Sequence, residues 1–199
     1  MGHLKTANKL IILLILVCAC NSDVQVPKPP VYPRIFYPEH EYKLTEEGLP
    51  YQFEQPVYSK LVSTQESKFT VNSDERYWKN LNFTPFNATL HLSYSSLNNM
   101  KDLDDLREET RRLAFEHSFK ADDIQTIEMS READHIYGNM YLIEGNTATN
   151  LNFYLTDSSK HFFRAALYFN KKTVPDSILP VYQFVKEDIE HLINTFQWK

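Results

Sequence analysis

The order in which two hydrophobic periods follow one another constrains the fold of this chain most. Apolar residues alternate with polar ones, as in half-buried strands, over residues 88–94, 149–156 and 161–169. Spacings of three and four residues, typical of amphipathic helices, replace this alternation over residues 101–118 and again from Val181 to Phe196. Strands, a helix, further strands and a final helix predict an α+β domain around a mainly antiparallel sheet with two principal helices.

Further short strands are predicted where β-favouring residues lie between turn-forming residues. These strands span residues 34–37, 51–54, 58–61, 78–83, 124–130 and 136–143. At the start of the final helix we expect Asp176 and Ser177 to cap the N-terminus. Pro180 is expected within the first turn, because proline lacks the N–H group that a helix interior needs.

Composition excludes several classes of function. The 199 residues carry a net charge of −5, which argues against a basic domain that binds nucleic acid. With four glycines, the chain has no glycine-rich phosphate loop. Cys18 and Cys20 lie close together near the N-terminus, so they form neither a disulfide framework nor a zinc ribbon. The zinc motif His-Glu-x-x-His does not occur, and we predict no metal, no cofactor and no nucleic acid partner.

The N-terminus has the pattern of an export signal. Two lysines precede an apolar run, residues 10–19, that is too short to span a membrane as a helix. Val17-Cys18-Ala19-Cys20 then matches a bacterial lipobox, in which a small residue precedes the lipidated cysteine. We therefore predict a lipoprotein signal peptide at residues 1–19 and a lipid, with acyl chains such as palmitate, on Cys20. An uncleaved signal anchor is the alternative.

Residues 20–33 are then the lipidated N-terminus and a tether, because proline-rich segments are extended and semi-rigid. Residues 34–199 form a single globular domain. Cleavage after Ala19 removes two lysines and no acid, which lowers the net charge to −7. A chain this acidic has no basic patch for anionic lipid, so we expect the lipid on Cys20 to hold it at the membrane.

One cluster of reactive residue types lies near the end of the predicted sheet. Asp157, Ser158, Lys160 and His161 are close in sequence, with Arg164 just beyond them. Members of a catalytic triad usually come from different elements. We therefore interpret the cluster as a polar hairpin turn and predict no catalytic residues. The alternative is an envelope hydrolase that uses Asp157, Ser158 and His161.

Large side chains are expected on the outward face of the last strands, and they are Tyr154, Phe162, Arg164 and Tyr168. If helices cover both faces of the sheet, the aromatic residues belong to the core. If one face is bare, the four residues form a candidate partner-binding face. His91 is expected to face solvent or a polar network. A ligand- or peptidoglycan-binding module is a third interpretation, which a deep pocket with convergent polar groups would favour.

Several longer segments resemble the gliding-motility lipoprotein family GldD. They are the lipobox, the tether, Pro-Tyr-Gln-Phe-Glu-Gln-Pro-Val-Tyr at 50–58, residues 86–94, residues 154–169 and the ending from Asp176 to Lys199. The resemblance covers almost the whole mature chain, although Ala165 stands where a glycine is usual. It implies a lipid-anchored, periplasmic protein of the Bacteroidota cell envelope, required for gliding and for the associated type IX secretion machinery.

The resemblance further implies no enzymatic activity, Cys20 as the one defined functional residue, and other gliding and secretion proteins as partners. The chain would then be an accessory subunit that acts by protein–protein interaction. The element order is also similar to that of the Mog1 and PsbP proteins, α/β/α sandwiches that help to assemble larger complexes; this likeness concerns the fold alone. In that phylum Asp176-Ser177-Ile178 has the spelling of an O-glycosylation site, with a helix cap as the alternative.

Overall fold

The structure describes the predicted globular domain and does not describe the predicted N-terminal segments. The computed structural model describes residues 35–45, 48–64, 74–116, 121–145, 147, 149–169 and 175–199, with backbone only at 175–177. Contacts divide the chain into residues 1–35 and 36–199, and every described strand and helix lies in the second unit. The predictions for residues 1–19, residues 20–33 and Cys20 lie outside the described residues.

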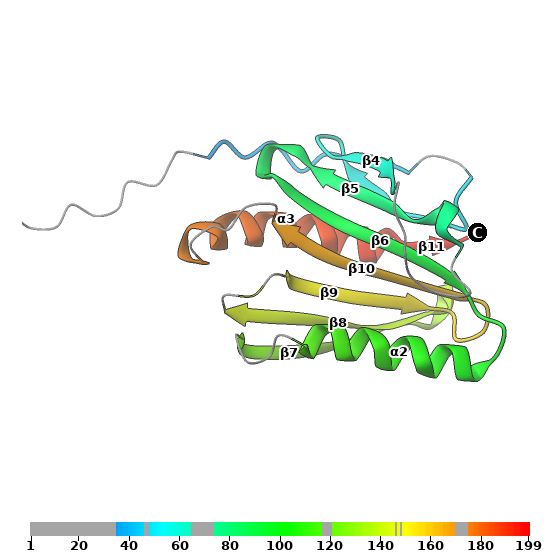
Figure 1. Cartoon of the computed structure of the whole chain (residues 1–199). Coiled ribbons are helices and arrows are strands. Elements are labelled where there is room, and N and C mark those ends of the chain that lie inside the picture. The colour runs from blue at the N-terminus through cyan, green and yellow to red at the C-terminus, as the bar shows by residue number, and fades with distance from the viewer. Residues whose placement is uncertain are drawn as a thin grey trace, which may run out of the picture. The chain divides into compact units, whose positions relative to one another are not determined.

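An antiparallel sheet of seven strands forms the centre of this unit, in the order β4-β5-β6-β10-β9-β8-β7 (Figure 1). In that order the strands are Lys60–Ser63, Lys79–Phe83, Ala88–Ser96, His161–Phe169, Thr149–Thr156, Ile136–Gly145 and Ala121–Arg131. Two smaller sheets pair β1 (Tyr42–Leu44) with β3 (Glu54–Pro56) and β2 (Tyr51–Gln52) with β11 (Gln197–Trp198). Short 3-10 helices span Glu75–Tyr77, Thr84–Phe86 and Glu132–Asp134. The predicted α+β class with a mainly antiparallel sheet is confirmed.

The two helices lie on opposite faces of this sheet (Figure 1). α3 (Pro175–Thr195) packs on what we call the inner face, where Val185 and Ile189 enter the larger core cluster. α2 (Met100–Phe115) packs on the outer face, where its Leu103 belongs to a second, smaller cluster. α2 contacts β9 and β10, and of the described helices none crosses the outer face of β5 or β6 (Figure 1). Among the described residues, the helices therefore leave part of the outer face uncovered.

Alternation along β10 distributes its side chains between these two faces. Phe163, Ala165 and Leu167 are fully buried on the inner face. Phe162 belongs to the smaller cluster beneath α2. The bounds of β9 and β10 agree with the predicted residues 149–156 and 161–169, because strict alternation is the most direct signal of a strand with two different faces.

Side-chain hydrogen bonds stabilise one end of each helix. At the start of α2, the Asn99 side chain accepts from the N–H of Asp102 at 3.0 Å, and Asp102 accepts from the N–H of Asn98 at 3.0 Å. These reciprocal bonds satisfy amides that the helix leaves unpaired. At the end of α3, the Arg131 guanidinium donates to carbonyl oxygens of Asn194 and Phe196. This contact satisfies C-terminal carbonyls and complements the helix dipole.

Three predictions about the ends of elements are wrong. Residues 35–37 form no strand, and Pro38, which lacks an N–H group, follows them. α3 begins at Pro175, so Asp176 and Ser177 lie inside the helix instead of capping it. Proline suits the first helical position because its φ is already helical. Pro180 consequently lies beyond the first turn. The Ser177 side chain, named above for glycosylation, lies outside the described residues.

A buried carboxylate ties the N-terminal part of the unit to α3. The Asp188 side chain is 1% exposed. It accepts from the Tyr42 hydroxyl at 3.0 Å and from the Tyr58 hydroxyl, and it lies 2.7 Å from Nδ1 of His40. Burial, followed by the nearby Asp188 carboxylate, raises the pKa of both tyrosines, so their hydroxyls stay protonated and donate. These bonds fasten residues 40–58 to a helix far away in sequence.

Removal of one of these donors should destabilise the fold. We expect Tyr58→Phe to lower the free energy of unfolding by about 1.5–3 kcal/mol, because the hydroxyl bonds to a buried charged group. Urea unfolding of the purified protein measures this loss. Tyr182→Phe is the matched control, since that hydroxyl lies on the same helix and, among the described residues, bonds to a carbonyl oxygen of Asn150 at 3.5 Å. Equal losses in the two variants would contradict the role given to Asp188.

Candidate functional site

The outer face carries a row of polar side chains that is interrupted by one small residue. The strand register aligns Asn80 on β5, His91 on β6, Ala166 on β10 and Asn152 on β9. On the same face of β10, the much larger Arg164 and Tyr168 lie on either side of Ala166, because alternate residues of a strand share a face. The small methyl group between two long side chains leaves a hollow in the sheet surface.

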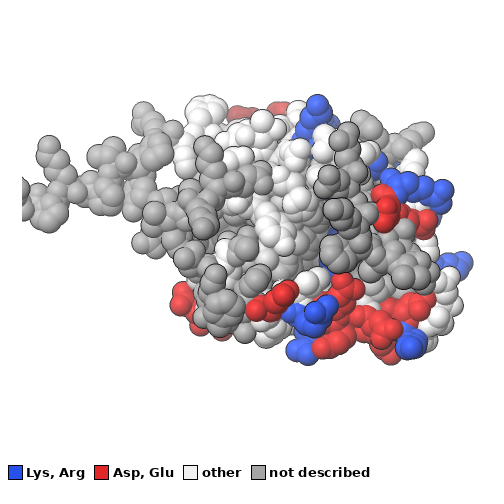
Figure 2. All heavy atoms as spheres, viewed as in Figure 1, with Lys and Arg blue, Asp and Glu red and all other residues white. Residues whose placement is uncertain are grey.

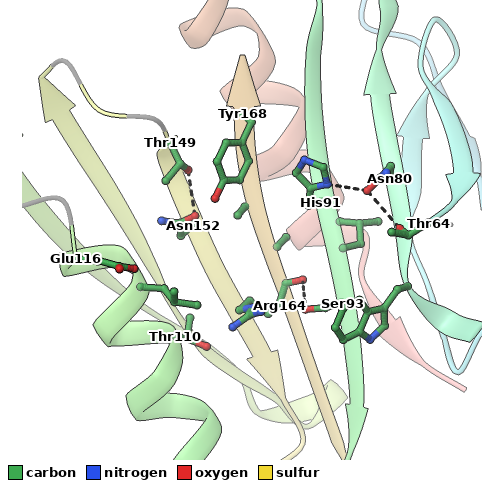
Figure 3. Close-up of a pocket in the computed structure, with 15 residues that line it drawn as sticks. Thr64, Asn80, His91, Ser93, Thr110, Glu116, Thr149, Asn152, Arg164 and Tyr168 are labelled. Atoms are coloured by element: carbon green, nitrogen blue, oxygen red, sulfur yellow. Dashed lines mark hydrogen bonds between the residues drawn. The ribbon is translucent and has the colours of Figure 1, made fainter. Parts of the chain in front are cut away.

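This hollow is a pocket of about 390 Å³ (Figure 3). Its volume lies in the range of about 300–1,000 Å³ that is typical of small-molecule sites. Thr110 and Leu113 of α2 line the pocket, as do Glu116, Trp78 and Thr64. Figure 3 shows Thr110 and Glu116 on one side of the pocket and Thr64 on the other. The indole N–H of Trp78 donates to the carbonyl oxygen of Tyr94 at 2.9 Å, which fixes this ring.

An irregularity in β9 adds a hydroxyl to the pocket. The register between β10 and β9 shifts after Leu167, so Tyr168 is opposite Thr149. Such a bulge re-aims a side chain that regular alternation would place elsewhere. The Thr149 hydroxyl donates to Oδ1 of Asn152 at 3.1 Å (Figure 3). Asn152 is 6% exposed, and its Nδ2 group has no hydrogen-bond partner among the described residues.

His91 contributes a neutral, oriented imidazole. Its Nδ1 lies 2.7 Å from Oδ1 of Asn80. Because an amide oxygen can only accept, Nδ1 carries the proton and Nε2 is left as an acceptor. Partial burial lowers the pKa of the His91 imidazole, which keeps the ring neutral near pH 7. The Tyr168 ring meets it edge-on, with centroids 5.2 Å apart and planes at 72°.

Charge is nearly balanced around the pocket. Nη1 of Arg164 lies 3.3 Å from Oε1 of Glu109, so the cation that lines the pocket is paired with an acid of α2. Glu116 is exposed and lies at the end of this helix. Figure 2 shows charged side chains gathered along α2, whereas most described atoms above it in the same view are uncharged. The pocket therefore presents mainly neutral hydrogen-bonding groups.

The structure divides the four residues of the candidate partner-binding face. Tyr154 and Phe162 stack with ring centroids 5.2 Å apart and are buried in the cluster beneath α2. They belong to the core, which agrees with the first of the two interpretations given for these aromatic residues. Arg164 and Tyr168 line the pocket instead. The division arises because α2 covers only one end of β10.

The residues of the alternative hydrolase form a turn. Oδ1 of Asp157 accepts from the N–H groups of Ser159, Lys160 and His161 at 3.0, 2.8 and 2.8 Å. Burial acts to raise the pKa of this carboxyl, but these backbone bonds and the Ser159 side chain outweigh it and lower the pKa. Ser158 has φ 62°, the left-handed conformation of a tight turn.

His161 points away from that turn. Its Nδ1 lies 2.6 Å from the Tyr94 hydroxyl, and its ring stacks on Trp198 with centroids 5.1 Å apart. Burial lowers the pKa of His161. Asp157 thus holds backbone and Ser159 while His161 holds Tyr94, and the structure does not bring them together as a triad. The prediction of a polar hairpin turn is confirmed.

Sequence reasoning missed most of the pocket. His91 was expected in a network or in solvent, and its bond to Asn80 confirms a network. The sequence pattern does not single out Asn80, Asn152 or Trp78. The signal available for Asn152 was its position among the outward-facing residues of a predicted strand. Nothing in the sequence indicated the bulge that adds Thr149.

Two general properties concern the described ranges alone. Among these residues no group of three or more His, Cys, Asp and Glu side chains is arranged to hold a metal ion. None of the helices within them combines the length and hydropathy needed to cross a bilayer.

Comparison with protein families identifies a match for this chain. A family model described as Gliding motility lipoprotein GldD matches residues 22–198. The search of curated proteins found no match. The matched range contains every strand and helix described above.

The hydrogen bond between Asn80 and His91 predicts a measurable pKa change. Asn80→Asp places a carboxylate beside Nδ1, which favours the imidazolium and should raise the pKa of His91 by about 1 unit or more. In the parent protein this ring should titrate below about 6.5. Two-dimensional NMR of the imidazole nitrogens against pH measures both values. Asn82→Asp, on the same strand, is the control; an unchanged His91 pKa in Asn80→Asp would contradict the geometry.

Proposed function

The chain belongs to the family of gliding motility lipoproteins GldD, and from this premise we propose that it is a lipid-anchored accessory subunit of the gliding machinery. It would serve that machinery and the associated type IX secretion apparatus in the cell envelope of Bacteroidota. It would act by binding partner proteins, with its domain on the periplasmic side of the membrane.

The match over residues 22–198 is the observation that carries this proposal. It begins two positions after Cys20, so it covers the tether and the domain and leaves the lipobox just before it. A lipoprotein family and a lipobox at that place are consistent with each other. Cys20 is therefore the proposed attachment point. Two or more acyl chains on this cysteine would anchor the protein firmly.

The turn at residues 157–161 supports binding over hydrolysis. Asp157 is occupied by backbone N–H groups, and the His161 imidazole is paired with the hydroxyl of Tyr94 on β6. A general base must lie within hydrogen-bond reach of its nucleophile. The alternative of an envelope hydrolase at Asp157, Ser158 and His161 therefore finds no support in this geometry.

Exposed apolar side chains of the N-terminal part of the unit support contact with a partner. Phe36 is 88% exposed, Leu44 57% and Val57 48%. Transfer of apolar surface from water into an interface is favourable by about 25 cal/mol per Å². These side chains follow the proposed tether in sequence, so a partner that binds them would lie near the anchored end of the chain.

The anchor can be tested with a matched pair of cysteine variants. Cys20→Ala should abolish incorporation of labelled palmitate and should reduce colony spreading and secretion. Cys18→Ala, two residues earlier in the lipobox, should retain the label and normal spreading. Metabolic labelling and spreading assays on both strains measure these outcomes.

Two results would contradict the proposal at different levels. Continued labelling of Cys20→Ala would show that the lipid is attached elsewhere. Normal spreading and normal secretion after deletion of the gene would show that the chain is not required for this machinery.

A further inference from the structure

The pocket over Ala166 has the composition of a site for a neutral, hydroxyl-rich ligand. We propose that it binds an uncharged saccharide, one or two rings in size. The proposal rests on the geometry of the outer face and is independent of the proposed role in gliding. It assigns a ligand to the residues that α2 leaves open.

Asn152 gives the most direct argument for a ligand. The residue is 6% exposed, and it lines the pocket. Oδ1 is used by the Thr149 hydroxyl, whereas Nδ2 has no partner among the described residues. An amide N–H donor that lines a pocket can bond to an acceptor on a ligand. A ligand hydroxyl or carbonyl oxygen could accept from Nδ2 of Asn152.

The opposite side of the pocket offers the complementary group. With its proton on Nδ1, held by Asn80, the neutral His91 ring presents Nε2 as an acceptor, which has no partner among the described residues and can accept from a ligand hydroxyl. The nearby Tyr168 is 36% exposed and presents both a ring and a hydroxyl. Sugars carry hydroxyls around a ring with apolar C–H faces, so they suit a site that combines aromatic rings with amides.

The pocket is also held in place before a ligand arrives. Trp78 is fixed by its bond to Tyr94, and His91 by its bond to Asn80. Both groups stand on or next to strands of the central sheet. Side chains that are already rigid lose little conformational entropy when a ligand binds, so less of the favourable binding free energy is offset.

Charged ligands fit this site less well. Arg164 is paired with Glu109 at 3.3 Å, so an anion would have to compete with an existing ion pair. Among the described lining residues, the carboxylate is Glu116, which is exposed at the end of α2. The remaining side chains are hydroxyls, amides, aromatic rings and aliphatic groups. An uncharged ligand loses no charge solvation on entry.

An extended peptide also fits less well than a saccharide. Peptides bind sheets most often by adding a strand to an open edge, where backbone N–H and C=O groups are free. The pocket lies in the middle of the sheet, where β6, β10 and β9 already pair with neighbours on both sides. Recognition here must use side chains, which favours a compact ligand rich in hydroxyls.

Titration with the disaccharide of N-acetylglucosamine tests the proposal on the full mature chain. We expect saturable NMR shifts of Asn152 and His91, with a dissociation constant of about 1 mM or tighter. Ala166→Leu fills the hollow and should weaken binding at least tenfold. Ser95→Leu, on the same face of β6 but outside the pocket, should bind as the parent does. Circular dichroism verifies that both variants fold.

A second pair of variants keeps the test decisive if Ala166→Leu does not fold. Tyr168→Ala should weaken binding at least tenfold, whereas Tyr137→Ala, outside the pocket, should not. The deacetylated disaccharide, which is cationic at neutral pH, should bind at least tenfold more weakly. The proposal is overturned by an absence of saturable shifts, by parent-like binding in both pocket variants, or by equal binding of the cationic disaccharide or of a neutral tripeptide.

Discussion

The register of β10 between β6 and β9 is the constraint on which the rest of this structure depends. It fixes Phe163, Ala165 and Leu167 on the inner face, where they form the core with α3. The same register sends Phe162 beneath α2 and sets Ala166 in the open part of the outer face. Since side chains alternate along a strand, a slip of one residue would exchange the two faces and remove both the core and the pocket.

The outer face of β10 is thus packed beneath α2 at one end of the strand and lines the pocket further along. Near the start of β10, large aromatic residues fill the space beneath α2. Further along, Ala166 is too small to fill that space, and the polar residues of the neighbouring strands surround a pocket. Because sheet and helix packing hold these residues in place, the hollow is a fixed feature of the fold. The Asp188 network acts elsewhere, on the inner side, where it fastens the segment nearest the tether to α3.

Much of the fold could be predicted from local pattern. Leu151, Phe153 and Leu155 alternate with polar or aromatic residues, and that period was sufficient to place β9 correctly. The pocket could not be predicted, because local pattern does not tell which strands are neighbours. Asn80 and Asn152 come together only through pairings across β6 and β10. The shift that brings in Thr149 depends on that same pairing, and so does the division of the aromatic residues between core and pocket.

Native-state hydrogen exchange tests the central place of β10 most directly. If the strand is the centre of the fold, the amides of Ala165 and Leu167 should exchange only through global unfolding, with the free energy that urea unfolding gives. Amides in the edge strands β4 and β7, such as those of Leu61 and Ile127, should exchange through smaller openings. Exchange of Ala165 and Leu167 as fast as that of the edge strands would contradict this account.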